Sequence, residues 1–396
     1  MLNCACGSQN YDQLLTLVCG NLDPSALYKT AKVVACRDCG HVFNLLTKEE
    51  EEGTIKYYQE EYSVNNINSC NPGGDLPGSV SKASLSRYQA LYDALDQCLR
   101  PSDAILDVGC ATGGFLSFLK AHGHTELYGT DFCSVFLMEA KKKEGIIIKQ
   151  GFAENIPFDR TFDLLIADQV VEHLFDPNLT FEEVKKHLRP GGRFCISVPD
   201  AERYTELAWF DFYWFLLREH VQHFDALHLE MLAKRHGFTC EKTVRITNPM
   251  LNERIRLPNL TMIFRLGNEK PLTPVLALDP KDLRVGIQKY VEACQRSLAQ
   301  RQDFMRKLCD SGVPFYCWGA CREFLYLYEN TDLKKCNIIG LLDDIPSKQT
   351  RTVGGMKIAS SSVLQNSTAN VLITAFAHKD IMEEKLKKMN FRGNVL

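Results

Sequence analysis

The chain has 396 residues, more than one ordinary hydrophobic core needs, so we expect two or three domains. Hydrophobic residues make up 45% of it and charged residues 24%, as in a globular protein. The formal charge of −3, the absence of a long apolar run and a first segment unlike a secretion signal together exclude a basic nucleic-acid binder, a membrane-spanning protein and a secreted one, so we expect a cytoplasmic location.

Two closely spaced cysteine pairs lie near the N-terminus: Cys4, Cys6, Cys36 and Cys39. Thiolates at such spacing close a tetrahedral Zn²⁺ site, and disulfides are rare in the cytoplasm. We therefore interpret residues 1–50 as a zinc-binding ribbon whose metal is structural. Cys19 or His41 could replace one ligand, and two unrelated reduced thiol pairs are the alternative.

Residues 51–62 are acidic and aromatic, and they include Tyr57, Tyr58 and Tyr62. A loop rich in glycine and proline over 71–78 follows. A helical pattern then runs over 84–99. We expect these tyrosines either to pack in a core or to form part of a helical lid over the domain that follows.

Beyond residue 100, short apolar runs alternate with helical patterns. We predict strands over 104–108, 127–130, 162–167, 193–198 and 257–265, and helices over 114–121, 134–143, 180–188 and 201–238. Residues 270–310 indicate a linker and a long helix over 282–308, and residues 311–396 begin a second alternation with strands over 315–318, 337–342 and 370–376. Such alternation is typical of parallel βαβ units, so the fold class is α/β with a central doubly wound sheet and a second, C-terminal α/β domain of Rossmann-like form.

The strongest motif joins the first of these strands to the first helix, where Asp107, Gly109, Ala111 and Gly113 occupy a short turn. Glycines let the backbone turn tightly and approach a ligand closely. A carboxylate at position 107 would repel a pyrophosphate and suits a ligand with an ammonium group. A second acid, Asp131, ends the next strand and can accept hydrogen bonds from both hydroxyls of a ribose.

Three later segments complete the pattern. The loop 151–158 could place backbone groups near Ala153 beside an adenine edge. The strand over 163–168 ends in Gln169, Glu172 and His173, and an Arg-Pro-Gly-Gly turn begins at residue 189. In this order the motifs resemble those of the class I methyltransferases that use S-adenosylmethionine (SAM).

The resemblance to these enzymes covers roughly residues 80–240 and implies a SAM site. Its cofactor-binding residues would be Asp107, Gly109, Gly113, Asp131, Phe132, Ala153 and Gln169. Residues 51–269 would form the methyltransferase domain with its N-terminal helical lid.

The full layout of zinc ribbon, SAM domain and C-terminal Rossmann-like domain resembles that of bacterial C-methyltransferases acting on nucleotide-linked deoxysugars. In that family a Tyr-x-Glu-His segment carries the chemistry. Here Glu219 and His220 match it, whereas Leu217 stands in the tyrosine position. A further active-site tyrosine near the N-terminus would be one of the three in 51–62, and we take Tyr58.

Methyl transfer to carbon requires removal of a proton next to a ketone, and a histidine near neutrality suits that task. Our hypothesis assigns His220 as the base, Glu219 as its partner and His223 as the second choice. The acceptor would be a small molecule, a nucleotide sugar, and we expect neither nucleic acid nor membrane as a partner and a monomer or homodimer. O-methylation of a sugar or surface-glycan precursor is the first alternative, and a non-catalytic zinc- and SAM-binding module is the second. The C-terminal domain would either anchor the nucleotide sugar or serve structure and dimerisation.

Overall fold

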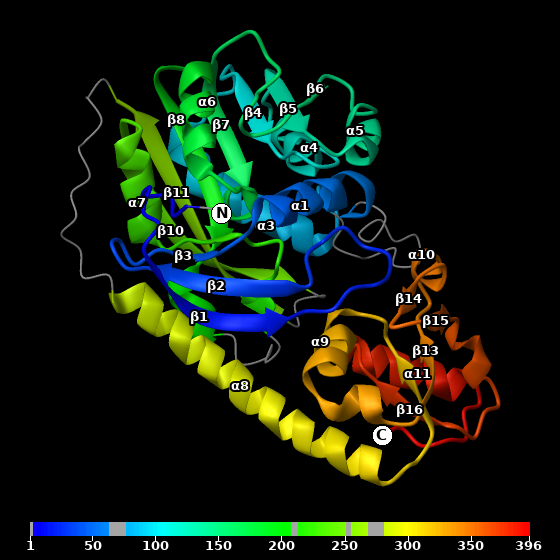
Figure 1. Ribbon diagram of the computed structural model, residues 1–396. Coiled ribbons are helices and arrows are strands. Elements are labelled where there is room, and N and C mark those ends of the chain that lie inside the picture. Colours follow the sequence, from blue (N-terminus) through cyan, green and yellow to red (C-terminus); the bar gives the residue numbers. More distant parts are fainter. Residues whose placement is uncertain (1–2, 63–76, 207–212, 251–254, 268–280) are drawn as a thin grey trace.

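The computed structural model describes residues 3–62, 77–206, 213–250, 255–267 and 281–396, and it arranges them around three β-sheets (Figure 1). The linker predicted over 270–280 lies outside these residues. Within the described ranges, helix α8 (Lys281–Asp310) is the longest, and no helix is both long and apolar enough to span a membrane.

The central sheet has the strand order β10-β11-β8-β7-β4-β5-β6. Its strands are β4 (Ile105–Val108), β5 (Leu127–Asp131), β6 (Ile147–Gln150), β7 (Phe162–Asp168), β8 (Leu188–Pro199), β10 (Phe238–Met250) and β11 (Ile255–Leu266). The five strands from β4 to β8 pair in parallel, whereas β11 pairs antiparallel with β8 and β10. The predicted α/β class is confirmed, with a mixed sheet in place of a purely parallel one.

Helices cover both faces of this sheet. They are α3 (Lys82–Leu95), α4 (Gly114–Ala121), α5 (Ser134–Ala140), α6 (Pro177–His187) and α7 (Ala226–Arg235). Because neighbouring side chains of a strand point to opposite faces, Ile105 packs with α3, α4 and α5, while Leu106 packs with α6 and α7. Strands buried on both faces read as continuous apolar runs, which is why the sequence pattern predicted them.

The predicted helix over 201–238 is wrong. A 3₁₀ turn at Ala201–Glu206, another at Trp214–Leu216 and the short strand β9 (Gln222–His223) stand in its place, ahead of α7. Tyr213 has φ of +53°, which a helix does not accept. The helix proper starts only where the Asp225 side chain accepts a hydrogen bond from the backbone N–H of His228.

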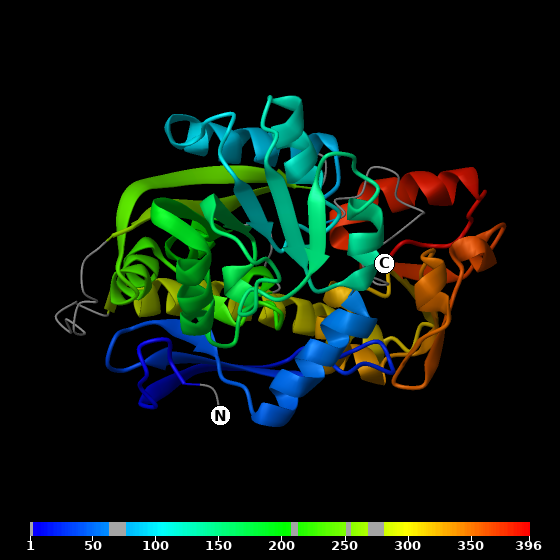
Figure 2. The same cartoon turned by 90° about the horizontal axis from the view of Figure 1, so that it is seen from above.

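The N-terminal sheet has the order β1-β2-β3-β9, from β1 (Tyr11–Val18), β2 (Thr30–Cys36), β3 (Val42–Asn44) and β9. Its fourth strand thus comes from a segment that follows the central parallel strands in the chain. Helix α1 (Lys48–Glu60) comes next, started by a capping box between Thr47 and Glu50. Figure 2 shows this sheet and α1 along one side of the central sheet.

The C-terminal sheet has the order β14-β15-β13-β12-β16. Its elements are β12 (Phe315–Trp318), α9 (Arg322–Asn330), β13 (Ile338–Leu342), α10 (Pro346–Gln349), β14 (Thr352–Val353), β15 (Met356–Ala359), β16 (Asn370–Ile373) and α11 (Lys379–Lys388). Helix α8 runs from below the N-terminal sheet to this domain (Figure 1). One apolar cluster joins Phe43 of β3, Ile287 of α8 and Phe324 of α9, so the two ends of the chain share a core.

Candidate functional site

A cavity of about 800 Å³ opens at the carboxyl ends of β4, β5 and β7. Ligands of open α/β sheets bind at this edge. Helix α1, the segment 214–220 and the C-terminal domain supply the opposite walls. The cavity therefore lies where all three sheets of the structure come together.

The glycine turn is shaped by backbone hydrogen bonds. The N–H groups of Gly109 and Cys110 donate to the carbonyl of Thr130 at 2.7 and 3.0 Å. The Asp131 carboxylate accepts from the backbone N–H of Ala111 at 2.9 Å and of Cys133 at 2.8 Å. Asp131 is therefore fixed in direction, and it lines the cavity.

Asp107 lines the same cavity and is buried, with 5% of its surface exposed. Burial raises the pKa of Asp107 well above its usual range, and the nearby carboxylates Asp168 and Asp131 raise it further. A cationic group of a ligand would stabilise the ionised form of such a carboxylate.

Gly109 is one of the cavity-lining glycines at which the structure leaves no room for a side chain. Its φ is +78°, and a Cβ there would lie 2.5 Å from Cγ2 of Val170. We expect Gly109→Ala to displace the turn and to weaken SAM binding at least tenfold, measured by calorimetry. Gly123→Ala is the matched control because Gly123 also has positive φ, but a Cβ added to it would meet no atom within 4 Å. That control should lose about 1 kcal/mol of stability and no SAM affinity; equal losses of affinity in both variants would contradict the steric explanation.

Six of the seven residues predicted to bind SAM line the cavity: Asp107, Gly109, Asp131, Phe132, Ala153 and Gln169. Gln169 has φ of +58°, a strained conformation at the end of β7, and its amide donates to Oδ1 of Asn259 at 2.8 Å. The rings of Phe132 and Phe152 lie nearly parallel with centroids 5.7 Å apart, forming an apolar rim suited to a planar base.

Gly113, the seventh, does not line the cavity. It is the N-cap of α4 with φ of +74°, and a Cβ on it would face the side chain of Lys143 at 3.2 Å. Its conformation serves the turn into the helix, and its contact with the cofactor stays a prediction.

Opposite the glycine turn, Tyr58 of α1 meets His173. The Tyr58 hydroxyl lies 2.8 Å from Nδ1 of His173, and the same nitrogen lies 2.7 Å from the carbonyl oxygen of Glu219. A carbonyl oxygen only accepts, so Nδ1 of His173 carries the hydrogen. The Tyr58 oxygen then accepts as well, and its own proton is free to point into the cavity.

Next to this contact lies Glu172, for which the sequence pattern predicts no role. It is 1% exposed, and neither carboxylate oxygen has a hydrogen-bond partner among the described residues. One oxygen and a ring nitrogen each from His173 and His220 lie within 4.8 Å of one another. Burial raises the pKa of Glu172 to about 8, so this carboxyl is protonated at neutral pH. The signal in the sequence was the position of Glu172 just after a buried strand.

Replacing Glu172 by glutamine should change how stability depends on pH. The folded carboxyl titrates near 8 and the unfolded one near 4.5, so the wild type loses stability as pH rises between these values, by about 1.4 kcal/mol per unit. We expect the free energy of unfolding of Glu172→Gln to rise relative to that of the wild type as pH increases across this range. Above the range the difference between the two should stay constant. Urea unfolding at pH 5, 7 and 8.5 measures these free energies. If they change with pH in the same way in both proteins, Glu172 keeps an ordinary pKa.

The far end of the cavity is basic. Arg218, Arg322, Lys348 and Arg351 line it, three of them from the C-terminal domain. Arg322 donates to the carbonyl of Tyr213 at 2.8 Å, while its Nη1 is buried without a hydrogen-bond partner among the described residues. The central sheet thus contributes Asp107, Asp131 and Asp168 to the cavity, whereas the C-terminal domain contributes basic side chains.

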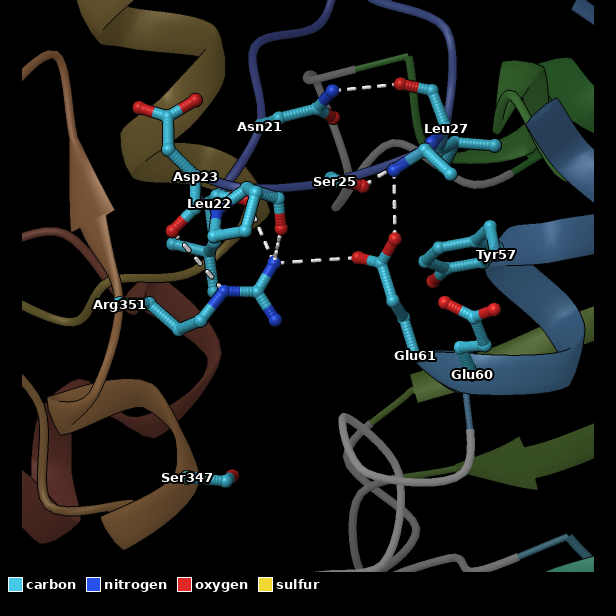
Figure 3. Close-up of polar contacts among 12 residues, drawn as sticks. Asn21, Leu22, Asp23, Ser25, Leu27, Tyr57, Glu60, Glu61, Ser347 and Arg351 are labelled. Carbon is cyan, nitrogen blue, oxygen red and sulfur yellow. Dashed lines mark hydrogen bonds and ion pairs between the residues drawn. The ribbon is translucent and has the colours of Figure 1, made fainter.

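Arg351 also connects the two ends of the chain (Figure 3). Its guanidinium donates to the carbonyls of Leu22 and Asp23 at 2.9 and 3.2 Å and pairs with Glu61 at 3.3 Å. Glu61 in turn accepts from the backbone N–H of Ala26 at 2.7 Å. These contacts hold the end of α1, and with it the tyrosines, against the C-terminal domain.

A family model described as "Methyltransferase domain" matches residues 83–243, the segment that forms the central parallel strands and the glycine turn. This segment is a SAM-dependent methyltransferase domain. It contributes Asp107, Asp131 and Asp168 to the lining of the cavity.

Several relatives are similar to the chain over part of its length. The chain is 29% identical over 134 residues to an uncharacterized 37.1 kDa protein of Streptomyces fradiae (32% of this chain, 38% of the relative). It is 33% identical over 116 residues to an uncharacterized methyltransferase of Schizosaccharomyces pombe (26% and 42%). It is 26% identical over 167 residues to a probable S-adenosylmethionine-dependent methyltransferase of Mycolicibacterium smegmatis (40% and 61%). The chain thus spans about two fifths of the length of the first two relatives.

Glu219 and His223, the predicted catalytic residues beside His220, differ in their surroundings. Glu219 lines the cavity, and its carboxylate accepts a hydrogen bond from the Tyr57 hydroxyl at 3.3 Å, whereas Glu172 groups with His220. His223 is fully buried in β9 beside Tyr204 and does not line the cavity. The catalytic roles of both residues stay predictions.

His220 itself lines the cavity, with its ring 5.0 Å from that of His173. Burial lowers the pKa of His220 well below its usual range, and the charges of His173, His223 and Arg322 lower it further. The ring is therefore neutral at pH 7. Its Nδ1 is buried without a partner among the described residues, so the ring retains capacity to bind a further group.

The four cysteines of the N-terminal pairs come together outside the methyltransferase domain. Their Sγ atoms all lie within 4.8 Å of one another, with Cys4 and Cys39 at 3.5 Å and Cys6 and Cys36 at 3.7 Å. A tetrahedral zinc with Zn–S bonds of about 2.3 Å requires S···S separations of about 3.8 Å, so the set fits that ion. The alternative ligands lie apart from it: Cys19 contacts the Tyr326 hydroxyl, and His41 contacts Gln222.

Proposed function

We propose that the protein transfers the methyl group of SAM to a nucleotide-linked keto sugar, with His220 as the general base. The observation that carries this proposal is the polarity of the cavity. Its side chains Asp107, Asp131 and Asp168 come from the methyltransferase domain, three of its basic ones come from the C-terminal domain, and the neutral His220 lines the same cavity.

At the acidic end, Asp107 would receive the ammonium of the methionine part and Asp131 the two ribose hydroxyls. Phe132 would cover the adenine, with Ala153 at its edge, and Gln169 would border the methionyl chain. SAM supplies an electrophilic methyl group, so the residues need only orient the acceptor and move its proton.

His220 would take the proton from the carbon next to the ketone. The Tyr58 O–H would donate a hydrogen bond to the ketone oxygen as negative charge develops there. The electron pair of the broken C–H bond would then form the new bond to the methyl carbon, the S–CH3 electron pair would stay on the sulfur of the leaving thioether, and the ketone would be re-formed. Glu172, kept protonated by burial, would donate a hydrogen bond near the same ring without adding a negative charge.

At the basic end, the unpartnered Nη1 of Arg322, together with Lys348, would bind the diphosphate of the acceptor. Lys348 pairs with Asp343 at 3.0 Å, so its ammonium is held in place. Lys348→Gln should raise the KM for the acceptor severalfold and leave SAM affinity unchanged, whereas an effect on SAM alone would argue against a phosphate site.

Leu217 favours a second candidate, O-methylation of a sugar, because it places an apolar side chain in the cavity where the resembled family has tyrosine. The same base would then deprotonate a hydroxyl. Incubation of the protein with ¹³C-methyl SAM and nucleotide-linked 4-keto sugars, followed by NMR of the product, distinguishes a C-methyl signal from an O-methyl signal. If calorimetry shows no SAM binding at millimolar concentration, both proposals fail.

We further propose that the four cysteines bind one structural zinc ion. The site offers four thiolates and no open position, so the metal would stabilise the N-terminal sheet and take no part in methyl transfer.

A further inference from the structure

Glu172, His173 and His220 line the same cavity but come from two separate segments of the chain. Glu172 and His173 lie in the 3₁₀ turn that follows β7, whereas His220 precedes β9. One oxygen of Glu172 and one ring nitrogen of each histidine lie within 4.8 Å of one another. Two imidazoles and one carboxylate are a donor set with which proteins bind divalent transition metals.

The hydrogen bonding of His173 directs a lone pair toward Glu172. Nδ1 of His173 carries the hydrogen, because it lies 2.7 Å from the carbonyl oxygen of Glu219. Nε2 therefore has the lone pair, and it lies 3.9 Å from Oε1 of Glu172. Metal-binding histidines donate their other ring N–H in this way, since such a hydrogen bond fixes the tautomer and the direction of the ring.

The other two side chains of the group offer buried atoms that the protein itself does not pair. Both carboxylate oxygens of Glu172 and Nδ1 of His220 are buried without a hydrogen-bond partner among the described residues. Such atoms are rare in folded proteins, because an unpaired buried polar group is destabilising. A bound cation would pair with these groups at once. Glu172, which is protonated in the metal-free protein, would release its proton to solvent, as a carboxylate ligand must.

The donor types and the separations fit a small transition-metal ion. Bonds of about 2.1 Å to nitrogen and oxygen require donors about 3.0–3.4 Å apart. The donors here are separated by at most 4.8 Å, so side-chain movements of about 1 Å close the set around an ion. Three protein ligands leave further positions open toward the cavity, which provides the path of entry. Two imidazoles disfavour Mg²⁺ and Ca²⁺, which prefer oxygen ligands.

We propose that Glu172, His173 and His220 bind one divalent transition-metal ion, through a carboxylate oxygen, Nε2 of His173 and Nδ1 of His220, and that this ion inhibits methyl transfer. A neutral imidazole has a single lone pair, so His220 either binds the metal or accepts the proton of the methyl acceptor. The metal site goes beyond the proposed function. Only the inhibition rests on it, through His220 as the base.

Titration of the full chain with Co²⁺, after loading with one equivalent of Zn²⁺, tests the binding. Zinc keeps the four cysteines occupied, because it binds more tightly than cobalt. We expect one cobalt ion per chain, with visible absorption bands and without the near-ultraviolet band of a cobalt–thiolate bond. Glu172→Gln and His220→Asn should each weaken cobalt binding at least about tenfold.

Glu183→Gln is the matched control, since Glu183 also lies beside a histidine, His187 at 3.1 Å, but outside the cavity. It should bind cobalt as the wild type does. Failure of the wild type to bind cobalt, a cobalt–thiolate band alone, or equal affinity in the wild type, Glu172→Gln and His220→Asn would each overturn the metal site.

The inhibition is measured separately, as the rate of methyl transfer against the fraction of the chain that holds cobalt. We expect the wild-type rate to fall in proportion to that fraction. An unchanged rate at full occupancy would overturn the inhibition and the assignment of His220 as the base, while the metal site stands. If the metal-free protein transfers no methyl group, the proposed function fails, and the cobalt titration still decides whether the site exists.

Discussion

Replacing Cys36 by serine is expected to remove a bound zinc ion and to lower the unfolding temperature of the whole chain sharply. Structural zinc contributes about 10–16 kcal/mol of apparent binding free energy in small zinc domains, and a serine hydroxyl does not replace a thiolate ligand. Cys36 ends β2 and belongs to the apolar cluster that also contains α8 and α9 residues, so its loss affects both ends of the chain. Metal analysis by mass spectrometry and thermal unfolding measure the two effects.

Cys240→Ser is the control for this experiment, because Cys240 is a partly buried thiol far from the cluster. It should keep the full zinc content and change the unfolding temperature by a few degrees at most. If the wild type carries no zinc as purified and gains no stability when zinc is added, the four sulfurs form an ordinary packed cluster of thiols.

The cofactor end of the site could be predicted from the sequence because it is built from local patterns. A buried strand, a turn of small residues and a helix place Asp107 and Gly109 at one sheet edge whatever the rest of the chain does, and parallel pairing brings Asp131 to the same edge. The turn, however, fixes where a residue lies in the backbone and not which group it contacts. Gly113 has the expected conformation and yet faces Lys143.

The acceptor end could not be predicted in this way, because it depends on contacts between distant segments. Tyr58 and His173 are 115 residues apart in the chain, and their contact requires α1 to be held over the cavity by Arg351 and Glu61. The pairing of Glu219 with His220 looked natural from adjacency in the sequence. Glu219 lies in a turn before β9, in which the His220 N–H donates to the Leu217 carbonyl at 3.0 Å, and its carboxylate accepts from Tyr57 instead.

Exchange of His220 for asparagine is expected to reduce turnover by about 10²- to 10⁴-fold while SAM affinity stays unchanged. The ring lines the cavity and is neutral at pH 7, so it can accept a proton, whereas an amide cannot. Because burial holds the pKa of His220 well below its usual range, the acid limb of the wild-type pH profile should fall below pH 6.5. Steady-state kinetics across pH and calorimetry with SAM provide both readouts.

His223→Asn separates the base from a merely structural histidine. His223 is fully buried against Tyr204 and Asn44 and does not border the cavity, so its variant should lose stability and keep most of its turnover per folded molecule. The reverse result, in which His220→Asn remains active and His223→Asn does not, would place the base on the packed side of β9. The methyl acceptor would then have to reach a histidine that does not border the cavity, and the cavity could no longer support the proposed function.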